Sequence, residues 1–505
     1  MTGSQQTAPQ VLEAIKEKPG EVMSDAYLAL WNEEEQARID RDIAAHRMAD
    51  AELTVENIPP GTSVSVEQIS HDFIFGAHIF NFDQLGSDEL NVRYKELYGT
   101  LFNSATIPFY WRKFEMEEGK PRFEAEYRDT ASFWNSVKDP KEQPHWRRPA
   151  TDPLVEFCED KGIRLHGHTL VWGNYRWHIP DWLLEKIPAV YRDKAIKQEN
   201  VNVAPRIEMF EALTPAQIEA LIPGFTTGSH TLMAKRIFEI ALRYKDRFHS
   251  WDIVNESATD FGKGVLPPGD GICKSGYGLM PGDYPFRAFK IAEAMFPGHV
   301  QLNINDYNLG EDYLAQIRHL KDRGCKIDIV GAQMHLFNPQ TCLDIADGKS
   351  DEQAPASVRK TMELLGRGGS PIHLSEITIT SPGTDERGQL IQAIIARNLY
   401  RLWFSLEPLM GITWWNVVDD CGAPGEPSVS GLFTREMQPK PSYFALNDLI
   451  HNEWKTCLSI RADEGRSVKF RGFSGKYRLG WTDAKGTHRV SAWELSKSEG
   501  IRPLP

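Results

Sequence analysis

The sequence predicts an α/β fold, a (β/α)8 TIM barrel accompanied by a small accessory β module, and three observations support this. Between residues 73 and 420, eight short β-rich apolar runs alternate with amphipathic helical stretches. Strands that alternate with helices pair in parallel, and eight such units are the number that closes a barrel. Nearly every run becomes polar or aromatic at its C-terminal end, which is where a barrel of this kind places its active site.

The barrel strands and helices follow from the spacing of apolar residues. The predicted strands lie at 73–80, 104–110, 163–172, 249–256, 300–308, 327–336, 371–379 and 411–419. Apolar residues at helical spacing predict helices at 229–248, 285–296, 311–324 and 386–406. The connections after the second, third and fourth strands are long and rich in Gly, Pro and aromatic residues, so we expect them to form the walls of a cleft.

The segments outside the barrel have a different pattern. Residues 1–50 predict a flexible polar lead-in up to residue 23, followed by one helix. Residues 51–72 alternate around a PPG turn and predict a β-hairpin. The barrel is assigned to 73–452, and 453–505 predict a module of four or five short strands. Because a hairpin alone is marginally stable, we expect it to join the C-terminal strands in one β-sandwich.

Composition limits the classes of partner. The 505 residues include 57 Lys and Arg against 70 Asp and Glu, a net charge of -13, which disfavours nucleic acid and anionic membranes and favours a neutral partner. The six cysteines have no paired spacing, so neither a zinc cluster nor a disulfide framework is indicated, and most are expected to be free or buried thiols. No oligomeric state is indicated.

The sequence also bears on location. No apolar run approaches the roughly 20 residues that cross a bilayer, and the first ten residues lack the pattern of a signal peptide. We expect a secreted or periplasmic protein whose signal peptide is absent from this sequence, with a cytoplasmic location left open.

Two carboxylates stand at the ends of barrel strands within apolar sequence, Glu256 in WDIVNE and Glu376 in IHLSEI. Hydrolysis of a glycosidic bond needs one carboxylic acid to protonate the leaving oxygen and one carboxylate to attack the sugar, about 5 to 5.5 Å apart in retaining enzymes. His335 at the end of the sixth strand is expected beside Glu376. Each Glu alone is more often part of a structural ion pair.

Neighbouring strands supply further groups that suit a sugar. Asn255 precedes Glu256, Asn305 and Tyr307 end the fifth strand, and Trp414 and Trp415 end the eighth. Aromatic rings stack on the apolar faces of sugars, while amides and imidazoles bind hydroxyl groups. A single Trp is more often a core residue, so it is the combination that favours a carbohydrate site.

Residues from about 73 to 450 resemble glycoside hydrolase family 10, the family of β-1,4-xylanases. The matching segments are HGHTLVW at 166–172, WDIVNE at 251–256, INDYN at 304–308, GAQMH at 331–335, LSEI at 374–377 and QPKPSY at 438–443. The resemblance implies that Glu256 is the acid/base and Glu376 the nucleophile of a retaining reaction on xylan or xylo-oligosaccharides. It also implies that Asn255 holds the 2-hydroxyl of the sugar in subsite -1 and that His335 orients Glu376. The other residues that match this subsite are Lys113, His168, Trp172, Gln333 and Trp415.

The chain departs from the family where the second sugar is bound. Phe109 and Tyr110 stand where the family has a Glu-Asn pair, and Tyr175 stands in the stretch where it has His-Ser-Gln. The second tryptophan usual after the eighth strand is not evident in DDCGAPGEPS. Aromatic surface at 109, 110, 175 and 177 is therefore expected to replace the polar contacts of subsite -2. A decorated oligosaccharide or a glycoside with an apolar aglycone is the alternative substrate.

Two other functions fit parts of the sequence. His166 and His168 form an HxH on one strand, as metal ligands do in amidohydrolase barrels, but here it lies on the third strand rather than the first. A catalytically inactive sugar-binding protein is the other alternative, and the presence of both carboxylates argues against it. The proposed reaction needs no cofactor or metal, since two carboxylates and water complete it. The C-terminal β module, with Trp481 and Trp493, is expected to be a structural buttress rather than a carbohydrate-binding domain.

Overall fold

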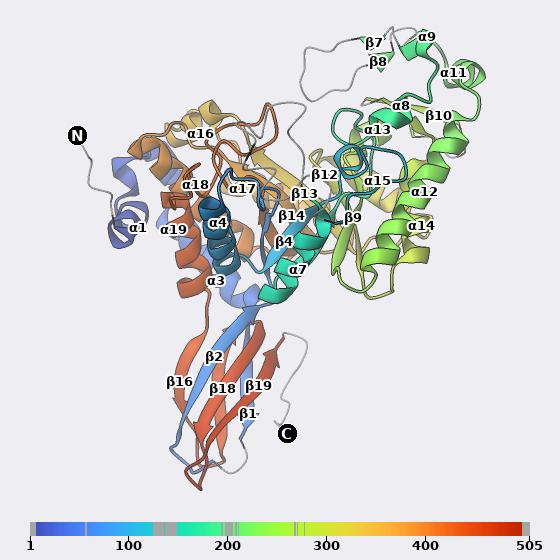
Figure 1. Cartoon of the computed structure of the whole chain (residues 1–505). Helices are drawn as coiled ribbons and strands as arrows, with labels where there is room; N and C mark the ends of the chain where they lie inside the picture. Colours follow the sequence, from blue (N-terminus) through green and yellow to red (C-terminus); the bar gives the residue numbers. More distant parts are fainter. Residues whose placement is uncertain are drawn as a thin grey trace.

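The computed structural model has a helix-ringed barrel with a β module extending below it (Figure 1). It describes residues 7–55, 58–124, 136, 149–192, 195–196, 206–207, 210, 212–266, 269, 271–276 and 278–496. Within these residues, no helix is long and apolar enough to span a bilayer.

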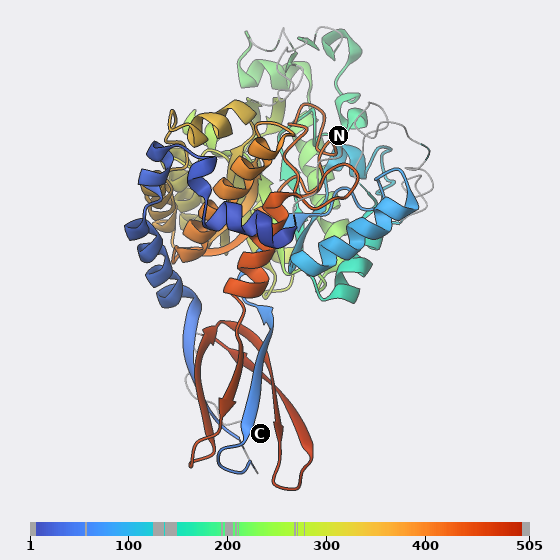
Figure 2. The same cartoon turned by 90° about the vertical axis from the view of Figure 1, so that its left-hand side faces the viewer.

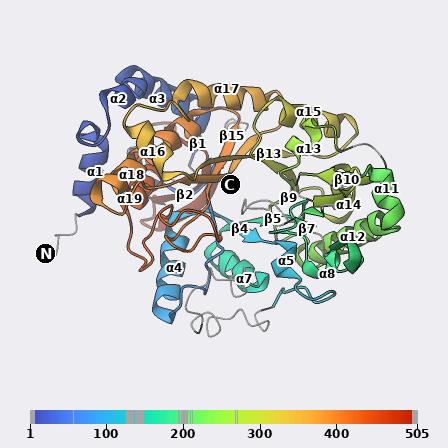
Figure 3. The ribbon, with the colours of Figure 1, turned by 90° about the horizontal axis from the view of Figure 1, so that it is seen from above.

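The barrel is formed by parallel strands whose hydrogen-bonded order runs β12-β13-β14-β15-β3-β4-β5-β9 and returns from β9 to β12. Seen from above, helices surround these strands (Figure 3). The strands are β3 Ile74–His78, β4 Ser104–Pro108, β5 Arg164–His168, β6 Val171–Trp172, β9 Ser250–Asn255, β12 Gln301–Asp306, β13 Ile329–Leu336, β14 Ile372–Ile379 and β15 Leu409–Trp414. The predicted third strand is divided into β5 and β6, which both pair with β9. The (β/α)8 prediction is confirmed.

The four predicted barrel helices are also present. Helices around the barrel include α4 Asp88–Leu101, α7 Thr151–Lys161, α12 Phe225–Tyr244, α14 Tyr284–Met295, α15 Glu311–Asp322, α17 Pro355–Gly366, α18 Glu386–Ser405 and α19 Pro441–Asp448. Helix α18 begins where Asp385 accepts a hydrogen bond from the Gly388 N–H, and most of its residues are buried. It therefore anchors the barrel to the elements outside it.

Shorter elements occupy the connections between strands and helices. They are α5 Trp111–Phe114, α8 Asp181–Leu184, α9 Ala189–Arg192, β7 Ala195–Ile196, β8 Arg206–Ile207, α11 Pro215–Leu221, α13 Ala258–Gly262, β10 Ile272–Ser275, β11 Gly278–Pro281, α16 Pro339–Ala346 and η2 Leu449–Glu453. The long connection after β9 thus contains α13 and the β10–β11 hairpin.

The prediction of a flexible lead-in is wrong from residue 8 onward, because this segment packs on the barrel. Helix α1 Ala8–Lys16 buries Val11 and Ile15. Lys16 Nζ at the end of α1 lies 3.1 Å from Asp448 Oδ2 and 2.7 Å from Glu453 Oε1. A short η1 turn, Pro19–Glu21, follows.

The single helix predicted for 24–50 is two helices, α2 Asp25–Leu30 and α3 Glu33–Arg47. Asn32 separates them because its side chain accepts a hydrogen bond from the Glu35 N–H and starts a new helix. The helical segment also ends three residues earlier than predicted, where strand β1 begins.

The β module combines strands from both ends of the chain (Figure 2). Its strands are β1 Met48–Thr54, β2 Ser63–His71, β16 Cys457–Arg461, β17 Ser467–Phe473, β18 Gly475–Thr482 and β19 His488–Leu495. The hairpin predicted for 51–72 is wrong: β1 pairs with β17, whereas β2 lies between β16 and β18 in a separate sheet. The two sheets share one core in which Leu53 packs with Val66 and Leu479. The N-terminal strands therefore face each other across a sandwich instead of pairing side by side.

Candidate active site

Glu256 and Glu376 both lie at the C-terminal end of the barrel. Glu256 directly follows β9 in a left-handed conformation with φ 53°, and its N–H donates to the Asn305 carbonyl at 2.8 Å. Glu376 lies within β14 and is only 5% exposed. A left-handed backbone is uncommon for a residue other than glycine, so the neighbouring strand holds Glu256 in an unusual orientation.

One hydrogen-bond network joins the surroundings of both carboxylates. Asn305 Nδ2 lies 2.8 Å from Asn255 Oδ1 and 2.8 Å from Glu376 Oε1. Gln333 Nε2 lies 3.1 Å from Glu256 Oε1 and 3.4 Å from Asn255 Oδ1. Gln333 is also the register partner of Glu376 in the β13–β14 ladder. Strands β12 and β13, which lie between the two carboxylates, thus contact both of them through amide side chains.

His335 lies between the Glu376 carboxylate and a hydroxyl. Its Nε2 is 3.3 Å from Glu376 Oε2, and its Nδ1 is 2.9 Å from Thr378 Oγ1. A carboxylate only accepts hydrogen bonds, so Nε2 carries the proton and Nδ1 accepts from the Thr378 hydroxyl. The protonated Nε2 therefore faces Glu376, the residue beside which the sequence placed His335.

The HxH histidines converge on one buried carboxylate. His166 Nε2 and His168 Nδ1 lie 3.0 Å and 2.7 Å from the same oxygen, Asp252 Oδ2. Burial opposes ionisation of Asp252, but the two imidazoles outweigh it and hold its pKa below the usual range. His168 Nε2 lies 3.8 Å from Glu376 Oε1. Within the described residues, no group of three His, Cys, Asp or Glu side chains is arranged to hold a metal ion.

Aromatic side chains gather at the barrel mouth, and we call them the mouth cluster. They are Phe80, Tyr110, Trp172 and Trp415, with Trp177 and Phe337 packed against them. The Trp415 ring lies 5.7 Å from that of His168, and the Phe337 ring stacks on His335 at 4.2 Å. The indole N–H of Trp415 donates to Glu426 Oε1 at 3.2 Å, so the loop after β15 contributes a carboxylate beside this cluster.

Several predicted binding residues lie around this mouth. Lys113 is half-buried on α5, directly after β4. Tyr110 precedes α5 and its ring lies 5.4 Å from that of His168. Tyr307 follows β12 and is 48% exposed.

Phe109 and Tyr175 do not belong to the mouth cluster, which corrects part of the predicted aromatic wall. Phe109 is fully buried and packs on Trp251 with ring centroids 4.8 Å apart. Tyr175 is 5% exposed, and its hydroxyl donates to the Leu279 carbonyl. Both rings are large enough to fill the space between the barrel and the long connections, so they are core residues.

The predicted site omitted residues that act through others. Asp252 and Thr378 were not singled out from the sequence and contact His168 and His335, whereas Asn305, which was expected to suit a sugar, donates to Glu376. The sequence feature that could have identified them is a polar side chain within a strand whose two faces are both buried. An unpaired polar group is costly there, so such a side chain must have a hydrogen-bond partner.

Asp306 ties together the loops that follow two of these strands. It is 0% exposed, and its carboxylate accepts hydrogen bonds from the N–H groups of Ala258 and Asn308, each at 2.8 Å. Burial raises its pKa to about 7, although hydrogen bonds from surrounding backbone groups act in the opposite direction. The segment after Glu256 is thereby attached to the end of β12.

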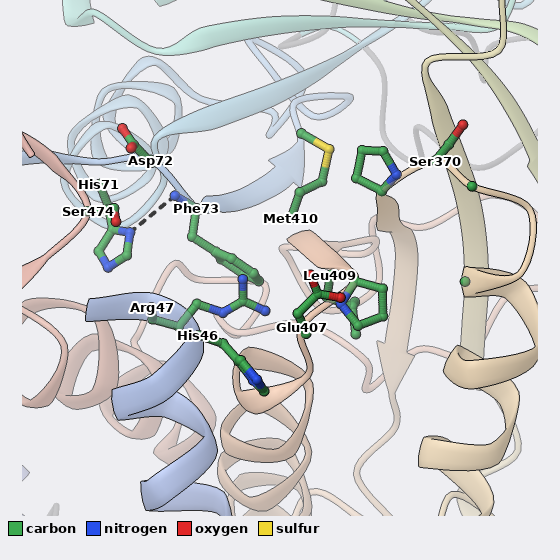
Figure 4. A pocket seen from close by; sticks show the side chains of 14 residues that line it. His46, Arg47, His71, Asp72, Phe73, Ser370, Glu407, Leu409, Met410 and Ser474 are labelled. Carbon is green, nitrogen blue, oxygen red and sulfur yellow. Dashed lines mark hydrogen bonds between the residues drawn. The ribbon is translucent and has the colours of Figure 1, made fainter. Parts of the chain in front are cut away.

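A cavity of about 500 Å³ lies far from the carboxylates, where the β module meets the barrel (Figure 4). Arg47 Nε donates to the Phe404 carbonyl at 2.5 Å, and His46 Nδ1 lies 2.7 Å from the Ser405 carbonyl. These side chains cap the C-terminus of α18. Burial lowers the pKa of His71 to about 3, and its ring lies between those of Phe75 and Phe404. The cavity therefore lies at the interface between the β module and the barrel.

All six cysteines are free thiols, four of them buried, as predicted.

Comparison with known protein families identifies the family of this chain. Residues 128–449, more than half of the chain, match the model of "Glycosyl hydrolase family 10". The chain belongs to glycosyl hydrolase family 10. The matched segment contains Glu256 and Glu376 but begins after β3 and β4, and therefore leaves out Lys113 and Tyr110.

Two relatives show how distant the similarity is, and both are longer than this chain. The chain is 24% identical over 306 residues to "Exoglucanase XynX" of Acetivibrio thermocellus, covering 59% of this chain and 24% of that protein. It is 26% identical over 340 residues to "Endo-1,4-beta-xylanase C" of Paenibacillus barcinonensis, covering 60% and 27%. The match spans about a quarter of the length of these relatives. The crystal structure of xylanase 10B from Thermotoga maritima aligns with 76% of this chain and 96% of that chain, at 20% identity and a TM-score of 0.49.

Proposed function

We propose that this family 10 chain is a retaining glycoside hydrolase that cleaves β-1,4 bonds in xylan or xylo-oligosaccharides. The observation that carries the proposal is the network in which Asn305 and Gln333 connect the surroundings of Glu256 and Glu376. The names of the relatives, several of them endo-1,4-beta-xylanases, support the substrate class. Family membership supports the reaction type.

In the first step, Glu376 attacks the anomeric carbon and the bond to the leaving oxygen breaks. Glu256, which is more exposed than Glu376, gives its proton to that oxygen. Asn305 and the Nε2–H of His335 hold the two oxygens of Glu376 in place for the attack. The products are a covalent glycosyl-enzyme and a sugar with a new hydroxyl group.

In the second step, Glu256 has become a carboxylate and removes a proton from water. The water oxygen attacks the anomeric carbon from the face that the leaving group vacated, and the bond to Glu376 breaks. The released sugar therefore keeps the original configuration, and both carboxyl groups return to their starting states. Two inversions give net retention.

The sugar at the cleaved bond is proposed to contact side chains around the network. Asn255 Oδ1 accepts from Asn305 and Gln333, so its amide N–H2 is the group that would bind the 2-hydroxyl. The remaining members of this proposed subsite are Lys113, His168, Trp172, Gln333, His335 and Trp415, with Tyr110 and Tyr307 at its edges. Tyr175 is left out because its hydroxyl is engaged with Leu279.

The barrel and the β module are proposed to have different roles. We propose residues 73–452 as the catalytic unit, with 51–72 and 453–505 in the β module that supports it. A polymeric substrate such as xylan is too large to enter a cell, so we also propose a secreted or periplasmic location.

A substrate screen with product analysis tests the proposal. Purified protein is incubated with xylan, linear xylo-oligosaccharides and other β-glycosides, next to the Glu376→Gln variant. We expect turnover of the xylose-based substrates by the wild type and binding without turnover by the variant. Turnover of another glycoside with no activity on xylose-based substrates would contradict the substrate, and unchanged activity of Glu376→Gln would contradict the mechanism.

A further inference from the structure

A second cavity, of about 240 Å³, adjoins the candidate site and shares two of its residues. Gln333 and His335 line it, and these are the residues whose side chains bond with Glu256 and Glu376. From there the cavity extends from β13 to helix α17 and the two residues Glu352 and Gln353 that stand shortly before it. We call it the side cavity.

The lining of the side cavity combines polar groups with a small apolar surface. The polar residues are Gln333, His335, Glu352, Gln353, Ser357 and Thr361. The apolar contribution comes from Leu309, Met334 and Val358. Sugar rings present hydroxyl groups around their edges and C–H groups on their faces, so this mixture suits a sugar.

Helix α17 presents the far wall of the cavity in a fixed position. Ser357 and Thr361 are one helical turn apart on the same face. Elsewhere on α17, Arg359 is held by Glu35 at 2.7 Å and by Asp42 at 3.2 Å, both from α3. The wall is therefore preformed.

Gln353 provides an acceptor that the protein itself does not use. Its Oε1 is buried and has no hydrogen-bond partner among the described residues. The residue stands in the left-handed region with φ 55°, directly before α17. Gln353 also lines a neighbouring cavity of about 10 Å³, which has room for about one water molecule. Because Gln353 lines the side cavity, a turn of its side chain would bring this oxygen to a ligand hydroxyl, which would supply the donor it lacks.

Size and charge define the ligand further. Drug-sized ligands occupy pockets of about 300–1,000 Å³, so about 240 Å³ suits a single sugar ring. No lysine or arginine is among the described residues that line the cavity, whereas Glu352 contributes an exposed carboxylate. An acidic sugar would be repelled, and a neutral one would not.

We propose that the side cavity takes a neutral monosaccharide branch carried by the sugar chain next to the cleaved bond. This rests on the proposed function, because it assumes that a sugar chain occupies the barrel mouth. The substrate is then a decorated chain, and the branch is bound by Gln353, Ser357 and Thr361 while Gln333 and His335 hold the carboxylates.

The test compares two variants on α17. Thr361→Phe fills the cavity, and Lys360→Phe adds the same ring at a neighbouring exposed position that does not line it. The substrates are a linear xylo-oligosaccharide and the same chain with one arabinosyl branch. We expect Thr361→Phe to lower kcat/KM for the branched chain about tenfold and to leave kcat/KM for the linear chain unchanged. We expect Lys360→Phe to change kcat/KM for neither substrate. Equal losses on both substrates, or no loss on either, would overturn the proposal.

A binding measurement separates this proposal from the proposed function. Binding of the branched and linear chains to Glu376→Gln protein, with and without Thr361→Phe, needs no turnover. If the wild type cleaves neither chain, the proposed function fails, while a preference for the branched chain that Thr361→Phe removes still supports the cavity assignment. Glu352→Gln is a smaller change than Thr361→Phe and removes the negative charge at the cavity. It should therefore improve binding of a chain with a glucuronosyl branch about threefold. No change there would contradict the charge argument.

Discussion

Asn305 Nδ2 lies 2.8 Å from Glu376 Oε1, a contact that joins the end of β12 to the middle of β14 across the intervening strand β13. The same amide group donates to Asn255 Oδ1, next to Glu256. Asn305 is fully buried. Its replacement is therefore expected to affect both the stability of the barrel and the position of the Glu376 carboxylate.

Asn305→Ala is expected to slow catalysis more than it weakens binding. A hydrogen bond to a charged group contributes about 1.5–3 kcal/mol, so we expect kcat to fall about 10- to 100-fold with a small change in KM. Steady-state kinetics on the best substrate measure this. Asn398→Ala, which removes a 2.9 Å bond to the Tyr27 hydroxyl away from the site, is the control. A similar loss of kcat in both variants would show that the effect is one of stability alone.

Thr378→Val tests the hydroxyl that fixes the tautomer of His335. Without the donor at Nδ1, the imidazole loses one of the two contacts that orient it toward Glu376. We expect kcat to fall about 3- to 10-fold, in line with one neutral hydrogen bond, and KM to change little. Thr378→Ser keeps the hydroxyl and should restore kcat, and a serine variant as slow as the valine variant would contradict the role.

Asp306 predicts a pH-dependent contribution to stability. Its pKa of about 7 in the folded protein lies above the usual 3.8, so between these values the folded state binds more protons than the unfolded chain. The residue's contribution to the free energy of unfolding is then full below about pH 4 and decreases as the pH rises through 7.

Urea unfolding of the wild type and Asp306→Asn at several pH values measures this contribution, because the other carboxyl groups cancel in the difference. The difference in unfolding free energy should be largest near pH 4 and should decline toward pH 8. A difference that grows with pH would mean that the ionised form of Asp306 is the stabilising one.

Trp493 tests the role of the β module. Its half-buried ring packs on Phe470 at 5.9 Å and on Tyr477 at 5.8 Å. Trp493→Ala should lower the free energy of unfolding by about 2 kcal/mol, below the cost for a fully buried ring, and leave the affinity for insoluble xylan unchanged. Lost affinity with unchanged stability would instead indicate a carbohydrate-binding surface.

The barrel could be predicted because its periodicity is local. Each strand is a short apolar run and each helix has a 3.6-residue pattern, so the eight units around Glu256 and Glu376 are visible in the sequence. The β module was harder, since the PPG turn between β1 and β2 suggested a hairpin, and only the distant partners β17 and β16 assign the two strands to different sheets.

The site was predictable to the extent that its residues lie at strand ends. The contacts of Asn305 and Thr378 depend on which atoms face each other across strands, which no single segment encodes. Phe109 and Tyr175 were expected at the mouth because of their position in sequence. Instead the Phe109 ring packs on Trp251 and the Tyr175 ring packs against Gly278 of β11, so both lie in the core.

The central claim is that Glu376 is the nucleophile and Glu256 the acid/base. The most direct test is whether azide restores the activity of Glu376→Ala and Glu256→Ala on an activated aryl β-xyloside. Without the nucleophile, azide should attack the vacated face and give the α-glycosyl azide. Without the acid/base, azide should attack the glycosyl-enzyme and give the β-glycosyl azide. The account predicts this pair of products, identified by NMR. The opposite configurations, or no rescue of either inactive variant, would contradict the assignment of Glu376 as nucleophile and Glu256 as acid/base.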